Sequence, residues 1–151
     1  MAVRVQAQDF DVSAELASLR AGHADAGAVV AFVGTVRELD GCGTVSALEL
    51  EHYPGMTEVV LADLAAEARR RWPVIDVAIV HRVGLLQAGE QIVLAAVAAR
   101  HRGDAFAACE FVMDILKTQA PFWKKETTPD GMRWVHARAS DDAAAARWTP
   151  Q

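Results

Sequence analysis

The order of apolar and polar residues along the chain predicts both short strands and amphipathic helices. Apolar stretches of strand length, some continuous and some alternating, occur at 3–8, 28–37, 45–53, 74–83, 91–99, 122–127 and 132–137. Apolar residues spaced by three and four predict helices at 11–20, 57–72 and about 104–120. Because strands and helices do not alternate regularly, the pattern favours an α+β fold with a mainly antiparallel sheet.

Two hairpins are predicted. The strands at 74–83 and 91–99 are joined by a connection at 84–90, which favours antiparallel pairing. The continuous apolar run at 91–99 predicts a strand buried on both faces. The turn residues at 128–131 predict the tip of a second hairpin, which adds a β-hairpin subdomain to the main sheet.

The strand at 28–37 carries a glycine at position 34 and ends in an arginine. Gly34 inside a strand indicates a β-bulge or a close approach by another backbone or a ligand. Arg37 at the strand end is placed either to meet an anion or to sit in solvent.

Cationic side chains lie at both ends of the helix at about 104–120. His101 and Arg102 stand just before it, and Asp104 is predicted to cap its first turn. The unpaired N–H groups and positive dipole of a helix N-terminus favour an anion, so these two residues are an anion-site candidate or ordinary surface charges.

The other end of this helix carries paired lysines. Lys117 falls in the last turn, Pro121 stops the helix, and Lys124 follows on the first arm of the second hairpin. Lys117 could simply complement the helix dipole. Alternatively, two amines held together in a partly dry pocket have lowered pKa values and act as a base or nucleophile.

Composition describes one globular domain spanning 1–151. The chain has 151 residues, 52% of them apolar and 23% charged, with a net charge of −5 that argues against a general nucleic-acid binder. No apolar run reaches the length of a membrane span, and the first residues lack a signal-peptide core, so a cytoplasmic protein is expected. The alanine-rich tail at 140–151 predicts a loosely held helix.

No motif for a metal or cofactor was found. Cys42 and Cys109 have neither metal-ligand nor disulfide-framework spacing, and no phosphate-binding glycine loop or nucleophile elbow occurs. Cys109 is interpreted as a core residue and Cys42 as a loop thiol. Histidines show no metal-binding spacing and are interpreted as structural or exposed, at positions 23, 52, 81, 101 and 136.

Several segments resemble the MoaE family, the large, catalytic subunits of molybdopterin synthase. The resemblance covers nearly the whole chain and is carried by GAVVAFVGTVRE at 27–38, LEHYPGMTE at 50–58, HRVG at 81–84, AARHRGDAF at 98–106, MDILKTQAPFWKKE at 113–126 and RWVHAR at 133–138. The segment at 113–126 is the most specific. Cys42 and the glycine-rich loop at 38–44 match no part of the family motif.

The resemblance implies an α/β hammerhead-type fold and a sulfurtransferase reaction without a bound cofactor. Cyclic pyranopterin monophosphate would receive two sulfurs and become the dithiolene of molybdopterin. The implied sulfur donor is a thiocarboxylate on the C-terminal Gly-Gly of a small ubiquitin-like subunit. The implied assembly is a heterotetramer built on a homodimer of large subunits.

The resemblance also implies a set of site residues. Two lysines match the family's catalytic pocket, Lys117 and Lys124. Substrate-binding positions match the cations Arg37, His101, Arg102 and Arg138 and the apolar residues Phe32 and Met113. Glu126 is expected to orient Lys124. On one straight helix His101 and Lys117 lie about 24 Å apart at about 1.5 Å per residue, so the site is predicted to be composite, with His101 and Arg102 supplied by a second copy.

Three other functions are compatible with the residues. A non-catalytic pterin- or nucleotide-binding module would use the same cations without lysine chemistry. A persulfide sulfurtransferase would depend on Cys42. A structural scaffold for a ubiquitin-like protein would form no product.

Overall fold

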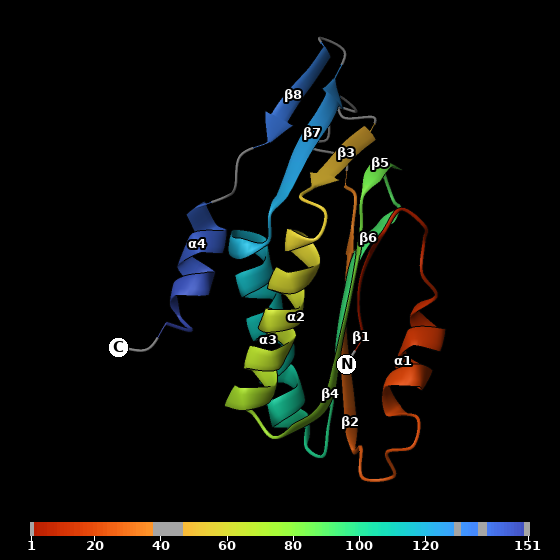
Figure 1. Cartoon of the computed structure of the whole chain (residues 1–151), viewed down its shortest axis with the longest axis vertical. Coiled ribbons are helices and arrows are strands. Elements are labelled where there is room, and N and C mark those ends of the chain that lie inside the picture. Colours follow the sequence, from red (N-terminus) through yellow and green to blue (C-terminus); the bar gives the residue numbers. More distant parts are fainter. Residues whose placement is uncertain (1, 38–46, 129–130, 136–138, 150–151) are drawn as a thin grey trace.

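The computed structural model describes residues 2–37, 47–128, 131–135 and 139–149. The elements, in chain order, are β1 (Ala2–Gln6), α1 (Val12–Arg20), β2 (Ala28–Thr35), β3 (Ala47–His52), α2 (Met56–Arg71), β4 (Val74–Arg82), β5 (Gly84–Gln87), β6 (Gln91–Ala99), α3 (Arg102–Gln119), β7 (Phe122–Thr128), β8 (Gly131–Val135) and α4 (Ala139–Ala146). Figure 1 shows two sheets, one above the other along the long axis. No helix in the described ranges is long and apolar enough to cross a membrane.

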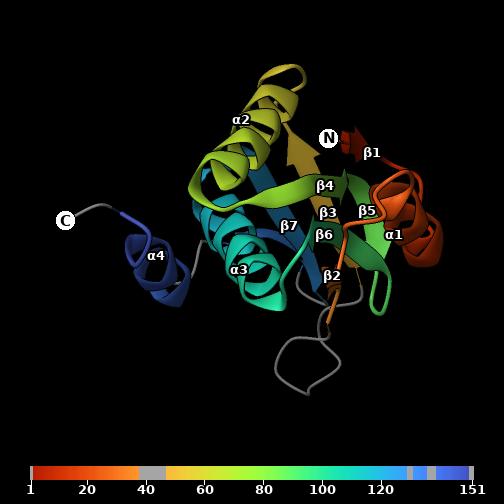
Figure 2. The same cartoon turned by 90° about the horizontal axis from the view of Figure 1, so that it is seen from below.

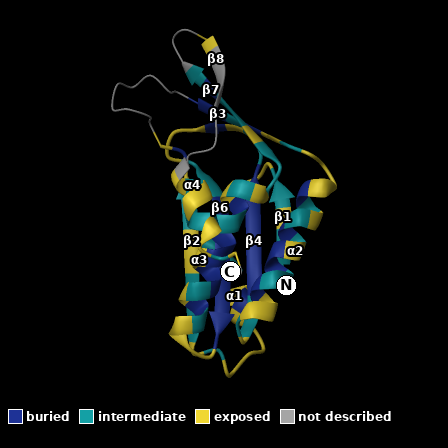
Figure 3. Cartoon of the chain, turned by 90° about the vertical axis from the view of Figure 1, so that its left-hand side faces the viewer, coloured by how far each residue is buried: buried dark blue, intermediate teal, exposed yellow. Residues whose placement is uncertain are grey.

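The first sheet has the strand order β1-β4-β6-β2. Its β4–β6 and β6–β2 pairs are antiparallel, and its β1–β4 pair is parallel. Helices α2 and α3 cover one face, and α1 covers the other (Figure 2). The predicted antiparallel pairing of 74–83 with 91–99 is confirmed, as is burial of β6 on both faces, since its residues 93–99 are at most 2% exposed. Figure 3 shows β4 as a dark blue, buried strand of this sheet, which lies between the helices on its two faces.

The second sheet, in the order β5-β3-β7-β8, is antiparallel throughout. The predicted β7–β8 hairpin is confirmed, although its tip at 129–130 lies outside the described residues. The connection predicted at 84–90 is instead partly a strand, β5, which pairs with β3. Four residues are too few to show an alternation of apolar and polar positions. The strand β5 is held in the sheet by Leu86, which is 1% exposed and packs against Leu48 and Leu50.

Helix α3 differs from its prediction at the N-terminus. It begins at Arg102, with His101 as the N-cap residue and no side-chain capping bond, whereas Asp104 lies inside the first turn. A carboxylate there still favours the helix dipole. At the other end α3 stops at Gln119, as the following proline predicts.

The C-terminal segment is attached to α3. Arg147 forms ion pairs with Glu110 and Asp114 at 2.9 and 2.7 Å, and the Trp148 indole N–H donates to Asp114 at 2.7 Å. Trp148 also packs edge-on against Trp72. These contacts place the described part of the tail against α3. The loose attachment of 140–151 in solution stays a prediction.

The structure confirms the bulge predicted at Gly34, but the close approach there is not made by another backbone or a ligand. The β2–β6 register shifts between Gly34 and Thr35, which is the irregularity of a bulge. A Cβ atom at position 34 would lie 2.8 Å from Val93 Cγ1 and 3.3 Å from Phe32 Cε1. The close approach is therefore made by side chains of this chain.

We expect Gly34→Ala to lower the free energy of unfolding by about 1–3 kcal/mol, because the added methyl overpacks a buried valine that has few rotamers. The matched control is Gly103→Ala in the first turn of α3, where a Cβ would meet nothing within 4 Å. Alanine there should stabilise the protein by up to about 1 kcal/mol. Urea unfolding of the two variants beside wild type measures both; equal stability of Gly34→Ala and wild type would contradict the close packing.

Candidate active site

The topology sorts the candidate cations between two ends of the molecule. The last residue of β2, Thr35, pairs with the first residue of β6, Gln91, so Arg37 lies at that end of the sheet. The chain leaves the far end of β6, enters α3 and returns, which brings Lys117 in the last turn back toward Arg37 (Figure 1). We call this the lysine end of the molecule.

Strand β7 places Lys124 and Glu126 on the inward face of the second sheet. Their cross-strand partners on β3 are Leu50 and Leu48, both buried. The Glu126 side chain is buried, and Lys124 is half-buried. The neighbouring Lys125 points to the opposite face, where it forms an ion pair with Glu51 at 3.5 Å.

The two site lysines lie near enough for the charge of Lys117 to act on Lys124. Burial, the nearby Lys117 charge and a hydrogen bond with Lys117 together lower the pKa of Lys124 from 10.5 to about 8, against the opposing effect of Asp141 and Glu126. An amine with this pKa is partly neutral near pH 7, so it can accept a proton or attack a carbonyl carbon. Lys117 itself is exposed.

A buried histidine completes the lysine end. His81, at the end of β4, is 4% exposed and stacks on Phe122 with ring centroids 3.7 Å apart and 16° between planes. Burial, together with the charges of Lys117, Lys124 and His52, lowers the pKa of His81 to about 4, against the opposing effect of its hydrogen bond with the Arg82 carbonyl. The sequence interpreted His81 as structural or exposed, and the structure shows that it is buried at the end of the strand that carries the HRVG segment.

Phe32 and Met113 lie on β2 and α3, two elements that pack against each other. Phe32 belongs to the face of β2 that α3 covers and is 41% exposed, whereas Met113 on α3 is 8% exposed and part of the core. The Phe32 ring lies over Gly34, as the short distance from its Cε1 shows. An exposed aromatic ring therefore extends from the strand edge toward the lysine end.

The single chain does not bring all the predicted residues together. His101 and Arg102 are exposed at the start of α3, a full helix length from Lys117. Within one chain they cannot share a small ligand with the lysine pair, as the spacing predicts. Arg138 and Cys42 lie outside the described residues.

Cys109 is excluded as a nucleophile. Its thiol is buried and donates to the Ala95 carbonyl at 3.5 Å, and burial raises its pKa to about 11. Among the residues that the structure describes, no group of three metal-ligating side chains occurs.

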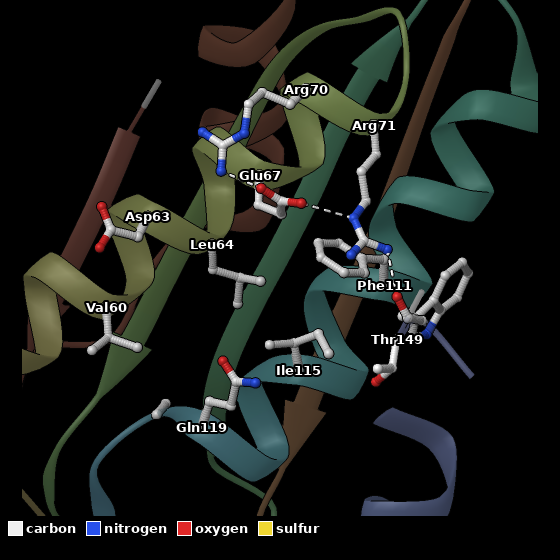
Figure 4. A pocket seen from close by; sticks show the side chains of 12 residues that line it. Val60, Asp63, Leu64, Glu67, Arg70, Arg71, Phe111, Ile115, Gln119 and Thr149 are labelled. Carbon is white, nitrogen blue, oxygen red and sulfur yellow. Dashed lines mark hydrogen bonds and ion pairs between the residues drawn. The ribbon is translucent and has the colours of Figure 1, made fainter. Parts of the chain in front are cut away.

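A groove of about 450 Å³ lies on the other side of α3, between α2, α3 and the tail. Figure 4 shows its apolar floor, formed by Leu64 and Ile115, with the Arg71 side chain beside Phe111. The Arg71 guanidinium lies 4.6 Å from the Phe111 ring centroid. Arg71 also pairs with Glu67 and donates to the Trp148 carbonyl. The Arg71 guanidinium is therefore already paired with groups of this chain. Neither Lys117 nor Lys124 lines the groove.

Comparisons with known proteins give a consistent family. The model described as MoaE protein matches residues 5–119. The molybdopterin synthase catalytic subunit of Ralstonia nicotianae is 58% identical over 146 residues, covering 97% of this chain and 83% of the relative. The solved MoaE protein from Burkholderia ambifaria is 64% identical with a TM-score of 0.84 and full coverage of both chains. Molybdopterin synthase from Staphylococcus aureus is 35% identical, with a TM-score of 0.81 over 87% of this chain and 95% of that one.

Proposed function

This chain belongs to the MoaE family, and we propose that it acts as the catalytic subunit of molybdopterin synthase with the Lys117–Lys124 pair as its sulfur-transfer site. It is a sulfurtransferase. The observation that supports the site is the placement of Lys124, which is half-buried on β7 opposite the buried Leu50 and lies within reach of the Lys117 charge. The comparisons favour this function over a binding module without lysine chemistry.

The proposed substrate is cyclic pyranopterin monophosphate, and the sulfur comes from the C-terminal thiocarboxylate of a small ubiquitin-like subunit. The name "catalytic subunit" of the relatives is consistent with such a partner. Cys109 does not support a competing persulfide reaction, since it is buried with a raised pKa; Cys42 lies outside the described residues. A cytoplasmic location is part of this proposal.

The lysine pair divides the work of acyl cleavage. After the thiocarboxylate sulfur bonds to the pterin, the partner remains attached through a thioester whose carbonyl carbon must be attacked. Neutral Lys124 accepts the proton of the attacking water, and the Lys117 ammonium stabilises the oxyanion that forms. If Lys117 is instead the nucleophile, an acyl-lysine adduct to the partner will be detected by mass spectrometry.

The anionic part of the substrate needs cations that one chain does not supply alone. Arg37 lies at the lysine end, but His101 and Arg102 lie at the far end of α3. A phosphate forms its strongest contacts with guanidinium groups and helix N-termini, and Arg102 begins a helix. We therefore assign these two residues to the site of a second copy.

The outer edge of β2 supports a specific geometry for the dimer. Among the described strands β2 pairs only with β6, so its other edge exposes backbone donors and acceptors. The strand, AVVAFVGT, carries no charge. Phe32 and, on the adjoining α3, Phe106 are 41% and 61% exposed. An uncharged edge with exposed aromatics beside it suits pairing with an identical chain.

Antiparallel pairing of two β2 edges would complete the site. The two copies would be related by a two-fold axis normal to the sheet. This rotation reverses the direction of α3, so His101 and Arg102 of the second copy come to the level of Lys117 and Arg37. The same axis creates a second, identical site at the other end.

Reconstitution tests the function. Purified chain, thiocarboxylated small subunit and cyclic pyranopterin monophosphate should yield molybdopterin and the carboxylate form of the small subunit. A folded chain that binds the small subunit and the pterin but forms no product would identify a binding module instead.

The rate of the acyl-cleavage step should rise with pH. Because the pKa of Lys124 is lowered to about 8, the neutral base is scarce below that pH and predominant above it. A single-turnover pH profile should therefore show an ascending limb with a midpoint near pH 8. Lys124→Arg keeps a permanent charge and should abolish this limb; an unchanged limb in that variant would remove Lys124 as the base.

A further inference from the structure

Arg82, the last residue of β4, is a buried cation that links two segments of the chain. Its side chain is 8% exposed, and its guanidinium donates to two backbone carbonyls, from Nε to Ala7 at 3.1 Å and from Nη1 to Gln91 at 3.0 Å. Nη1 also lies 3.9 Å from a carboxylate oxygen of Asp9 and 3.6 Å from one of Glu90. Burying a guanidinium is costly unless it is paired and hydrogen-bonded, so these contacts hold the segment after β1 against the turn before β6.

The turn that Arg82 holds also fixes the backbone just after β2. The Val36 N–H donates to the Glu90 carbonyl at 2.9 Å, and the Gly89 N–H donates to the Val36 carbonyl at 2.7 Å. Val36 is 5% exposed, whereas the next residue, Arg37, is exposed. The backbone that carries Arg37 is therefore anchored on this turn, and the turn is anchored on Arg82.

We propose that Arg82 is a positioning residue for Arg37, which it holds at the lysine end through the turn between β5 and β6. The inference rests on the proposed function and deepens it, because Arg37 is there assigned to the anionic part of the pterin substrate. A cation binds a phosphate best when its place is set beforehand, since ordering it on binding costs free energy. Arg82 does not touch the substrate in this proposal; it acts by keeping Arg37 in place.

Arg82→Lys should weaken the binding of cyclic pyranopterin monophosphate and leave the chemical step intact. Lysine keeps the buried positive charge beside the two carboxylates, but its ammonium cannot reproduce the planar fork that reaches two carbonyls. In calorimetric titrations the dissociation constant should rise by about 5-fold or more, up to the rise in Arg37→Ala, which is about 10-fold or more for one charge-assisted contact. The single-turnover rate at saturating pterin should stay within about two-fold of wild type, because the lysine pair is unchanged.

A double-mutant cycle distinguishes positioning from a general loosening of the fold. In the Arg37→Ala background, Arg82→Lys should cause no further loss of pterin affinity, because no guanidinium is left to position. Equal losses in the two backgrounds would show that Arg82 acts independently of Arg37 and would overturn the proposal.

The matched control is Gln91→Ala. The Gln91 side-chain amide donates to Asp9 and to the Phe10 carbonyl, at 2.9 Å each, so the variant loosens the segment after β1 but keeps the backbone carbonyl that Arg82 binds. Its pterin affinity should stay within about two-fold of wild type. A loss as large as that of Arg82→Lys would trace the effect to the segment after β1 and overturn the role of the turn.

Amide hydrogen exchange tests the link without pterin or small subunit. In Arg82→Lys the Val36 and Gly89 amides should exchange about 10-fold faster or more, because their hydrogen bonds depend on the turn, while amides in the centre of β6 keep their protection. If Arg82→Lys fails to fold, Glu90→Gln removes a carboxylate that faces Arg82 from a side chain 40% exposed and should speed exchange at the same two amides. Unchanged exchange at both amides would overturn the proposal. Faster exchange in a chain whose wild type binds no pterin would support the link and contradict the proposed function alone.

Discussion

Replacing Lys117 by alanine is expected to reduce molybdopterin formation by about 10²- to 10⁴-fold, the range for loss of an essential acid–base or electrostatic group. The ammonium of Lys117 both stabilises the oxyanion and lowers the pKa of Lys124. Its removal therefore takes away a charge and makes the remaining amine a stronger but mostly protonated base. Single-turnover assays with thiocarboxylated partner measure the loss.

Lys125→Ala is the matched control for this variant. Lys125 differs from Lys124 by one position but lies on the opposite face of β7, in an ion pair with the half-exposed Glu51. Exposed ion pairs contribute little to stability, so this variant should stay folded. Because Lys125 points away from the lysine pair, the variant should also keep nearly the full rate. Comparable losses in Lys117→Ala and Lys125→Ala would indicate a general charge effect and contradict a dedicated lysine pair.

Hybrid dimers should recover activity that neither parent variant has. Lys117→Ala loses the amine, and Arg102→Ala loses a charge-assisted contact to the substrate phosphate that is worth about 1.5–3 kcal/mol. In a composite site each active centre takes Lys117 from one copy and Arg102 from the other. A hybrid of the two variants then contains one doubly altered site and one intact site.

Coexpression with two different affinity tags gives purified hybrids for this test. The hybrid should work at roughly half of the wild-type rate per dimer, because one of two symmetric sites is intact. If Lys117 and Arg102 served the same site within one chain, both sites of the hybrid would be altered, and its rate would stay at the level of the parent variants.

The elements that could be predicted from sequence are those with strong local patterns. The apolar run of β6 indicates burial on both faces, and the structure confirms it, with residues 93–99 at most 2% exposed. Pro121 and the spacing of α3 placed Lys117 in the last turn, where it lies. The separation of His101 from Lys117 followed from helix geometry alone.

The elements that were missed depend on contacts distant in sequence. Strand β5 exists because Leu86 packs with Leu48 and Leu50, and no local alternation reveals that. The surroundings of His81 are formed by Phe122 and by two lysines from other elements. The start of α3 was placed at Asp104 because a carboxylate is a common cap, but His101 occupies that position without a side-chain bond.

The measurement that tests the central claim most directly is the product stoichiometry of a single-turnover reaction. Wild-type chain, thiocarboxylated small subunit and cyclic pyranopterin monophosphate are mixed, and molybdopterin and spent small subunit are quantified together. We predict that each molybdopterin is accompanied by two molecules of small subunit in carboxylate form, since each sulfur of the dithiolene leaves one behind. Spent small subunit without molybdopterin, or no spent small subunit from a folded chain that binds it, would contradict sulfur transfer at the lysine pair.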